Sequence, residues 1–394
     1  MLEASVTTNP SLADRIINLT SPNDFNHFTP QSGCKIAIGG GKGGVGKTCL
    51  ALLLGIFLAR HQQKVLLIDA DISGPNLHRF FGIKAPDRPL LHFLTNKIDH
   101  VGDLQENTPF EFLKCIFNQN GLPPLKDLEK RKKVLFQQLN ELDVDVIIFD
   151  SSSKMHDLSV EFFLRADYHL LISNSELMSI QQNFNYLKYC TLFQLKQAWQ
   201  QTTAINFNEF NFQDRFQKNY RLLMQRLLNE VRTSAPDALC AFQEEFKKFK
   251  PYLVFNMSHQ DAIKKQEMAL KLAAKEILDI EIHYLGTLDF VADLRKAIRS
   301  KAPLLELEKL LKNWPEFQRL AVNLFQKYPA ALERRTFRQT FNRLITPRLP
   351  FNTVEKDNQI ICSSQCPYWV KCRMRRGGYS CRVEYIGFLC KYAV

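Results

Sequence analysis

The chain has 394 residues, of which 45% are hydrophobic and 23% charged, a globular composition that excludes wholesale disorder. Its longest apolar run, residues 49–59, is far shorter than the ~20 residues of a membrane-spanning helix. No secretory signal is visible in the polar first thirty residues, which predicts a cytoplasmic protein. The net charge of +12 is concentrated in residues 330–394, together with five of the ten cysteines. We therefore expect a polar leader (1–33), a main domain (34–329) and a basic, cysteine-rich tail (330–394).

Short apolar runs alternate with longer helical stretches throughout the main domain. Six runs are rich in Ile, Val and Leu without polar alternation, as strands covered on both faces are: 35–39, 64–69, 145–150, 168–173, 252–256 and 280–286. The helical spacers between them imply right-handed crossovers. The pattern predicts an α/β fold with a doubly wound, mostly parallel sheet.

Two stretches do not fit this simple alternation. Residues 190–250 are long and helical in pattern, which predicts an inserted helical subdomain or a lid. Apolar residues recur at helix spacing over 304–325, with Pro315 beginning a second helix. This second stretch either closes the sheet as its last helices or lies on a membrane surface.

A glycine-rich string follows the first predicted strand and precedes an apolar helix. It reads Gly39-Gly40-Gly41-Lys42-Gly43-Gly44-Val45-Gly46-Lys47-Thr48. Several glycines let a tight loop turn its backbone amides inward, onto the phosphates of a nucleotide, at the N-terminus of a helix. Lys47 is placed to contact the β- and γ-phosphates, and the Thr48 hydroxyl is placed to bind Mg²⁺.

Lys42 adds a second lysine five positions before Lys47. With it, the loop resembles the deviant Walker A loop of the MinD/ParA family of ATPases, which are P-loop proteins of the SIMIBI type. In that family the extra lysine reaches the nucleotide of a partner copy. The resemblance implies ATP and Mg²⁺ as ligands, an ATP-dependent homodimer, and catalytic roles for Lys42 and Lys47.

The likeness to this family continues downstream of the loop. Val65–Asp71 resembles its second strand, whose final aspartate, here Asp71, orients the attacking water; a turn or helix-cap aspartate is the alternative. Asp150 matches the Walker B aspartate that holds Mg²⁺ through water, and a carboxylate at a strand's C-terminal end faces the ligand crevice of such a sheet. Asn256 aligns with a residue that often reads adenine. Cys49 stands where relatives carry a hydroxyl near the α-phosphate.

Residues 72–78 and 162–180 are most similar to the FlhG-like subgroup of flagellar-number regulators. One departure affects the expected chemistry. The family has a glycine-bearing switch after the Walker B aspartate, whereas this chain has Ser151-Ser152-Ser153-Lys154. Glycine there lets the backbone follow the γ-phosphate, so the resemblance implies ATP binding and leaves ATP hydrolysis open.

The tail carries Cys362, Cys366, Cys372 and Cys381 within twenty residues, followed by Cys390. Four thiolates suit a tetrahedral Zn²⁺ or an iron–sulfur cluster, and buried or incidental thiols are the alternative. Arginines and aromatic residues surround the cysteines. Such a surface suits nucleic acid, an anionic membrane at which the protein would be peripheral, or an acidic protein, and a solvated basic face is the alternative.

These features predict an ATP-binding dimerisation switch of the MinD/ParA type that hydrolyses ATP. Its output would be spatial positioning or the regulation of an unknown protein partner. Two other classes remain open. One is an iron–sulfur carrier ATPase of the Mrp type, and the other is a scaffold that binds ATP without hydrolysing it.

Overall fold

The computed structural model describes residues 33–121, 127–202, 228, 231–233, 236–258, 260–289, 291–300 and 303–326. The predicted cysteine-rich tail, with its candidate ligands Cys362, Cys366, Cys372 and Cys381, and nearly all of the predicted leader lie outside the described residues. The chain divides into two compact units. Among the described residues, the first unit comprises 33–36, 48–150 and 291–326, and the second comprises 37–47 and 151–289.

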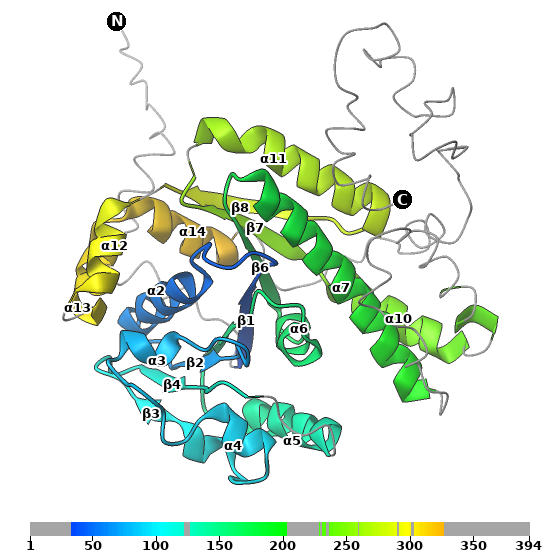
Figure 1. Cartoon of the computed structure of the whole chain (residues 1–394), viewed down its shortest axis with the longest axis horizontal. Coiled ribbons are helices and arrows are strands. Elements are labelled where there is room, and N and C mark those ends of the chain that lie inside the picture. The colour runs from blue at the N-terminus through cyan, green and yellow to red at the C-terminus, as the bar shows by residue number, and fades with distance from the viewer. Residues whose placement is uncertain are drawn as a thin grey trace, which may run out of the picture. The chain divides into compact units, whose positions relative to one another are not determined.

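Eight strands form one sheet in the order β3-β4-β2-β5-β1-β6-β7-β8. Their bounds are β1 Cys34–Gly39, β2 Val65–Asp69, β3 Glu106–Asn107, β4 Leu113–Ile116, β5 Val146–Asp150, β6 Tyr168–Ser173, β7 Pro251–Asn256 and β8 His283–Leu288 (Figure 1). β2 pairs in parallel with β4 and β5, and β7 pairs in parallel with β6 and β8. Only β3, which pairs with β4, is antiparallel among the pairings described for these residues. The predicted α/β class with a mostly parallel sheet is confirmed.

The sequence pattern missed two strands and misplaced a third. β3 has two residues and β4 has four, with the exposed Lys114 inside β4, so neither reads as an apolar run. β8 begins at His283, three residues after the predicted start at Ile280. Ile280 and Ile282 are buried, but they lie in the connection after Asp279, whose left-handed φ of 57° ends the preceding helix. The sequence pattern therefore included these two buried residues in the strand, although they precede it.

In the first unit, one apolar helix and the C-terminal helices form a common core. Its helices are α2 Lys47–Arg60, α3 Leu77–Phe80, α4 Leu90–Leu94, the 3₁₀ turn Val101–Leu104, α5 Leu128–Glu141, α12 Ala292–Arg299, α13 Pro303–Lys312 and α14 Pro315–Gln326. The rings of Phe57 in α2 and Phe317 in α14 lie 6.0 Å apart, and Arg60 pairs with Glu308. The two helices predicted over 304–325 are present, and Pro315 begins the second. Their apolar faces are buried, which favours the sheet-closing interpretation over a membrane-surface helix.

The second unit holds the long helix α7. Its helices are α6 Asp157–Leu164, α7 Leu177–Thr202, α10 Pro236–Lys248, α11 Gln260–Ala273 and the π-helical turn Ala274–Leu278. α7 packs against α10 (Figure 1). The described part of the predicted 190–250 insertion is helical, and consists chiefly of the C-terminal half of α7 and of α10. In the part of the chain described, no helix combines the length and apolar character needed to cross a bilayer.

Candidate nucleotide-binding site

The glycine-rich loop joins β1 to α2, as the sequence predicts. Neighbouring atoms lie too close to several of its glycines for a larger residue to fit, and the approach is closest at Gly41 and Gly46. A Cβ on Gly41 would lie 2.0 Å from the carbonyl oxygen of Gln182, and a Cβ on Gly46 would lie 2.4 Å from Nδ2 of Asn256. Gly46 also has a left-handed φ of 90°. Glycine is therefore required both by the turn and by the close approach of other segments.

Two buried asparagines fix the loop in place. The amide of Gly41 donates to Oδ1 of Asn183 (2.8 Å), and Nδ2 of Asn183 donates to the carbonyl of Ile172 (3.0 Å). Nδ2 of Asn256 donates to the carbonyl of Val45 (2.8 Å). These contacts hold the loop to α7 and to the end of β7. Sequence reasoning missed Asn183, because it lies within a long helix and no motif marks it.

Asn256 is where the sequence places it, at the C-terminal end of the buried strand β7. Its amide nitrogen contacts the loop, and its side chain is buried. The adenine-reading role that the resemblance implies stays a prediction, and the contact present in the structure is a loop brace.

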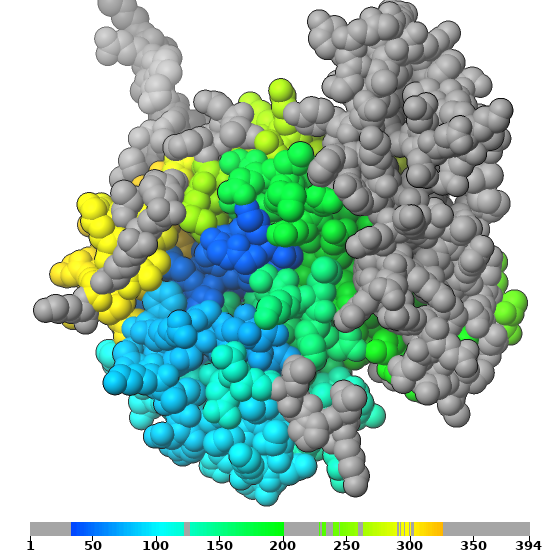
Figure 2. Space-filling model, viewed as in Figure 1, coloured from blue at the N-terminus to red at the C-terminus, as the bar shows by residue number. Residues whose placement is uncertain are grey.

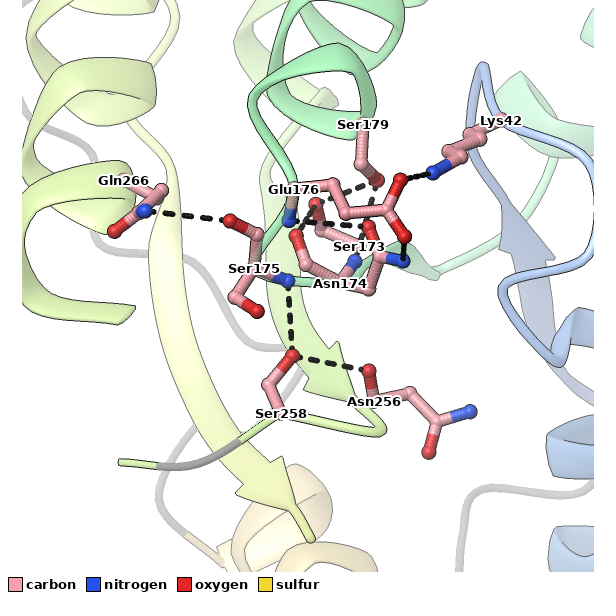
Figure 3. Close-up of polar contacts among 9 residues, drawn as sticks. All are labelled: Lys42, Ser173, Asn174, Ser175, Glu176, Ser179, Asn256, Ser258 and Gln266. Atoms are coloured by element: carbon pink, nitrogen blue, oxygen red, sulfur yellow. Dashed lines mark hydrogen bonds and ion pairs between the residues drawn. The ribbon is translucent and has the colours of Figure 1, made fainter. Parts of the chain in front are cut away.

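The two lysines of the loop have different surroundings. Lys47 is only 9% exposed, and its Nζ donates to the carbonyl of Lys42 (2.9 Å). The Lys42 ammonium forms an ion pair with the carboxylate of Glu176, which immediately precedes α7 (Figure 3). Gly43 and Gly44, between them, are exposed, and the loop region, in blue, reaches the molecular surface in Figure 2. The Lys47 ammonium therefore contacts the backbone of the loop itself, whereas the Lys42 ammonium contacts a side chain outside the loop.

Helix α2 leaves its N-terminus available for an anion. No acidic side chain lies in its first turn, so the partial positive charge of the helix end is not neutralised there. The second residue of α2 is Thr48, which is half-buried, and the third is Cys49, which is buried. Burial, and to a lesser degree Asp150, raises the pKa of the Cys49 thiol to about 12, so the thiol stays neutral. The sequence places Cys49 near an α-phosphate, and its side chain is packed in the core.

Two buried aspartates face each other across neighbouring strands of the first unit. Asp69 ends β2 and Asp150 ends β5, and they are in register as a pair. Asp69 accepts hydrogen bonds from the amides of Leu77 (3.1 Å) and Asp71 (3.2 Å). Burial first, and then the charge of Asp150, raises the pKa of Asp69 well above its usual value. A cation at these strand ends would remove the repulsion between the two carboxylates.

These strand ends suit Mg²⁺ by the chemistry of their donors. Mg²⁺ prefers oxygen ligands, and it commonly takes one or two carboxylates together with waters and substrate phosphates. Asp150 and the Thr48 hydroxyl supply such oxygens, as the sequence predicts. Among the described residues, no group of three or more His, Cys, Asp or Glu side chains could hold a metal ion by itself.

Asp71 accepts hydrogen bonds from the amides of Ser73 (2.8 Å) and Gly74 (3.0 Å). These contacts are those of a turn aspartate, which is the alternative left open above. They occupy one carboxylate oxygen, Oδ1. The water-orienting role stays a prediction.

In the segment after Asp150, serine and lysine side chains stand where the resemblance implies glycine. Ser151 donates its amide to the carbonyl of Ile38 (2.9 Å), and Ser151 and Ser152 are each 1% exposed. The Ser152 hydroxyl accepts from the amide of Lys154 (3.1 Å). The Ser153 hydroxyl lies 3.5 Å from the place where a Cβ on Gly43 would be. A serine hydroxyl therefore borders the exposed tip of the loop.

A glycine-rich loop that joins a buried strand to an apolar helix and carries Lys42 and Lys47 is characteristic of a nucleotide-binding α/β protein of the P-loop class. The family model for the CobQ/CobB/MinD/ParA nucleotide binding domain matches residues 36–304. The chain belongs to this family.

Among curated relatives, the chain is 28% identical to the antiactivator FleN of Pseudomonas aeruginosa over 156 residues, which is 39% of this chain and 55% of that protein. It is 48% identical to an iron–sulfur cluster carrier protein of Helicobacter pylori over 52 residues, 13% of this chain and 14% of that one. The solved structure of the septum site-determining protein MinD from Pyrococcus horikoshii, complexed with Mg-ADP, is 15% identical. That match covers 76% of this chain and 99% of the other, with a TM-score of 0.46. The chain spans about half the length of the curated relatives it matches over extended regions.

Proposed function

We propose that this protein is an ATP-dependent dimerisation switch that hydrolyses ATP. The observation that carries the proposal is the loop itself, in which Lys42 and Lys47 both border a glycine turn braced by Asn183 and Asn256. Membership of the nucleotide-binding family supports the ligand class. A loop held on both sides keeps its amides oriented before the nucleotide arrives, and such preorganisation lowers the cost of binding.

Each residue of the site has a role in this proposal. The amides of Gly41–Thr48 and the Lys47 ammonium would hold the phosphates of ATP, and Thr48 and Asp150 would hold Mg²⁺, which would neutralise phosphate charge. Asp71 orients a water molecule. The oxygen of this water attacks the γ-phosphorus as the bond to the β–γ bridging oxygen breaks, giving ADP and phosphate. Lys42 of a second copy neutralises charge on the phosphates, because phosphoryl transfer depends mainly on positioning and electrostatic stabilisation.

The output of the switch would be the placement or regulation of another protein. The similarity to FleN, an antiactivator by its printed name, supports a regulatory role within the FlhG-like subgroup. The basic tail is the predicted contact surface for a protein partner, nucleic acid or an anionic membrane, and it lies outside the described residues.

Light scattering tests the proposal directly. The mass of the full chain is measured without nucleotide, with ADP and with ATP–Mg²⁺, and phosphate release is recorded on the same samples. We expect a doubled mass with ATP–Mg²⁺ alone, lost in Lys42→Ala. A constant mass without turnover would overturn the proposal.

One observation favours a second candidate, a scaffold that binds ATP without hydrolysing it. Ser151 and Ser152 are buried side chains in a segment where the resemblance expects glycine, so the backbone there has less freedom to follow the γ-phosphate. Turnover equal to that of Lys47→Ala, with ATP still bound by the unaltered chain, would select this candidate. The iron–sulfur carrier alternative depends on the tail cysteines and stays a prediction, which iron and sulfide analysis of the full chain would test.

A further inference from the structure

The segment that follows β5 is fixed to the strand that leads into the glycine-rich loop. The Ser151 amide donates to the carbonyl of Ile38 in β1 (2.9 Å), and Ile38 directly precedes Gly39, the first glycine of the string. Residues 37–47 and 151–154 belong to the same compact unit. The position of this segment relative to the loop is therefore a property of the second unit alone.

The three serines of the segment have different surroundings. Ser151 and Ser152 are buried, whereas Ser153 is half-buried. The Ser151 hydroxyl has no hydrogen-bond partner among the described residues. The Ser152 hydroxyl accepts from the Lys154 amide (3.1 Å), which closes a turn around Ser153. A ligand that arrives from solvent therefore meets the Ser153 hydroxyl before the other two.

The Ser153 hydroxyl borders the tip of the loop. Its oxygen lies 3.5 Å from the place where a Cβ on Gly43 would be, whereas a Cβ on Gly44 would meet nothing within 4 Å. Both glycines are exposed, so the tip is open to solvent. Within the described part of the chain, the Ser153 hydroxyl takes part in no hydrogen bond, so its donor remains available. A group held at the loop tip would therefore have this hydroxyl beside it.

The order of residues along the loop indicates which phosphate lies at its tip. Lys47 is placed to contact the β- and γ-phosphates, and the resemblance places Cys49 near the α-phosphate. Gly43 lies on the opposite side of Lys47 from Cys49 in the chain, so the tip belongs to the terminal end of the phosphate chain. A hydroxyl can rotate to donate to an anionic phosphate oxygen, and such charge-assisted hydrogen bonds are stronger than neutral ones.

We propose that the Ser153 hydroxyl binds the terminal phosphate of ATP and so contributes to the preference of this chain for ATP over ADP. The inference rests on the proposed function for ATP as the ligand, and it adds a side-chain contact in a segment where the resemblance implies glycine. A glycine has no side-chain donor, so this contact is particular to the present sequence. One hydrogen bond at a half-buried position changes affinity by about three- to tenfold.

Ser175 offers a matched control. It is also a half-buried serine of the second unit. Its contacts in Figure 3 are made by its backbone, since its amide donates to the Ser258 hydroxyl (2.9 Å) and its carbonyl accepts from Gln266 (3.2 Å). Ser175→Ala therefore removes a hydroxyl of similar exposure, whereas Ser153→Ala removes the one at the loop tip. Ser153→Thr keeps that hydroxyl and adds a methyl group.

The first measurement compares two nucleotides by isothermal titration calorimetry on the full chain. Adenylyl imidodiphosphate, which carries a terminal phosphate and resists hydrolysis, and ADP are each titrated with Mg²⁺. We expect Ser153→Ala to weaken the binding of adenylyl imidodiphosphate by about three- to tenfold and to leave ADP affinity unchanged. Ser153→Thr should bind the analogue more tightly than Ser153→Ala, and Ser175→Ala should match the wild type with both nucleotides. An equal loss for both nucleotides, or a loss for neither, would overturn the inference.

The second measurement separates this contact from dimerisation. The titrations are repeated with Ser153→Ala in the Lys42→Ala chain, which does not dimerise according to the proposed function. We expect the same loss of affinity for adenylyl imidodiphosphate, because the hydroxyl and the loop belong to one chain. A loss that disappears in this background would overturn the inference. A chain that never dimerises or hydrolyses ATP, yet shows the selective loss in Ser153→Ala, contradicts only the proposed function, and a chain that binds neither nucleotide contradicts both.

Discussion

The side-chain amide of Asn256 donates a hydrogen bond to the carbonyl of Val45 over 2.8 Å, so the end of β7 is fixed to the middle of the glycine-rich loop. The two residues are 211 positions apart in the chain. Asn256 is 4% exposed, and a hydrogen bond at a buried site is costly to lose. The conformation of the loop therefore depends on a residue from a distant strand as well as on its own glycines.

Replacing Asn256 by alanine distinguishes two roles of its side chain, which are bracing the loop and contacting adenine. If the amide acts only on the loop, Asn256→Ala weakens the binding of ATP and GTP alike, by about 1 kcal/mol or roughly fivefold. Isothermal titration calorimetry with both nucleotides measures this, with Asn140→Ala, an exposed asparagine on α5, as the control. A loss confined to ATP would show instead that the side chain reads adenine.

Gly41→Ala should disturb both the conformation of the loop and its packing against α7. The new Cβ would lie 2.0 Å from the Gln182 carbonyl in α7, and backbone cannot yield as a side chain can. We expect a destabilisation of about 1–3 kcal/mol, several degrees in melting temperature, and loss of ATP binding. Gly102→Ala, with nothing within 4 Å of its Cβ, is the control and should melt like the wild type. Normal ATP affinity in Gly41→Ala would contradict the close packing of the loop.

Asp150→Asn should stabilise the nucleotide-free protein and remove its response to Mg²⁺. The folded-state pKa of Asp69 is raised above the ordinary 3.8 by burial and by Asp150, so the stability contribution of Asp69 is lost as pH rises through that folded-state value. Removing the Asp150 charge lowers the folded-state pKa, and less stability is lost at neutral pH. We expect the melting temperature at pH 7.5 to rise by about 2–4 °C.

The same Asp150→Asn samples are melted with ATP plus Mg²⁺ and with ATP plus a chelator. Wild type should melt higher with Mg²⁺, and the variant should show no difference between the two conditions. If the Asp150→Asn variant still melts at a higher temperature with Mg²⁺ than with the chelator, the ion binds elsewhere.

His169 should make the protein less stable in mild acid. Its ring is buried against Phe163 and Phe249, at centroid distances of 5.5 and 5.0 Å, and burial lowers its pKa from 6.5 to about 4. The unfolded chain takes up a proton as pH falls below 6.5 and the folded chain does not, so stability falls with pH until about pH 4. The loss from this residue between pH 7.5 and pH 5 is about 2 kcal/mol.

Urea unfolding of wild type and His169→Phe at both pH values isolates this contribution. Phenylalanine keeps the aromatic contacts and cannot be protonated, so the stability difference between the two proteins should shift by that amount in favour of the variant at pH 5. The exposed His100→Gln should follow the wild type. If the stability difference between wild type and His169→Phe is the same at both pH values, the buried imidazole is not held neutral.

Local sequence patterns were sufficient to predict the fold class and to identify the phosphate-binding loop. Strands β2 and β5 are continuous apolar runs that end in aspartate, and all five residues of each are buried. The glycine spacing, Lys47 and Thr48 identify the phosphate loop, because these roles depend on residues adjacent in the chain. Strand β4 escaped detection because its four residues include an exposed lysine, and its pairing with β2 stabilises it without a strong local signal.

By itself, the sequence determined that this protein has an α/β fold with a mostly parallel sheet and a glycine-rich loop between its first strand and helix. The tertiary structure alone decided which residues hold that loop. Asn183 is 142 positions from Gly41, and Glu176 is 134 positions from Lys42. An asparagine inside a helix and a glutamate just before one are common residues, and neither carries a local signature. Their meaning arises only because the α7 segment packs against the loop, since a hydrogen bond or ion pair depends on proximity in space and not on separation along the chain.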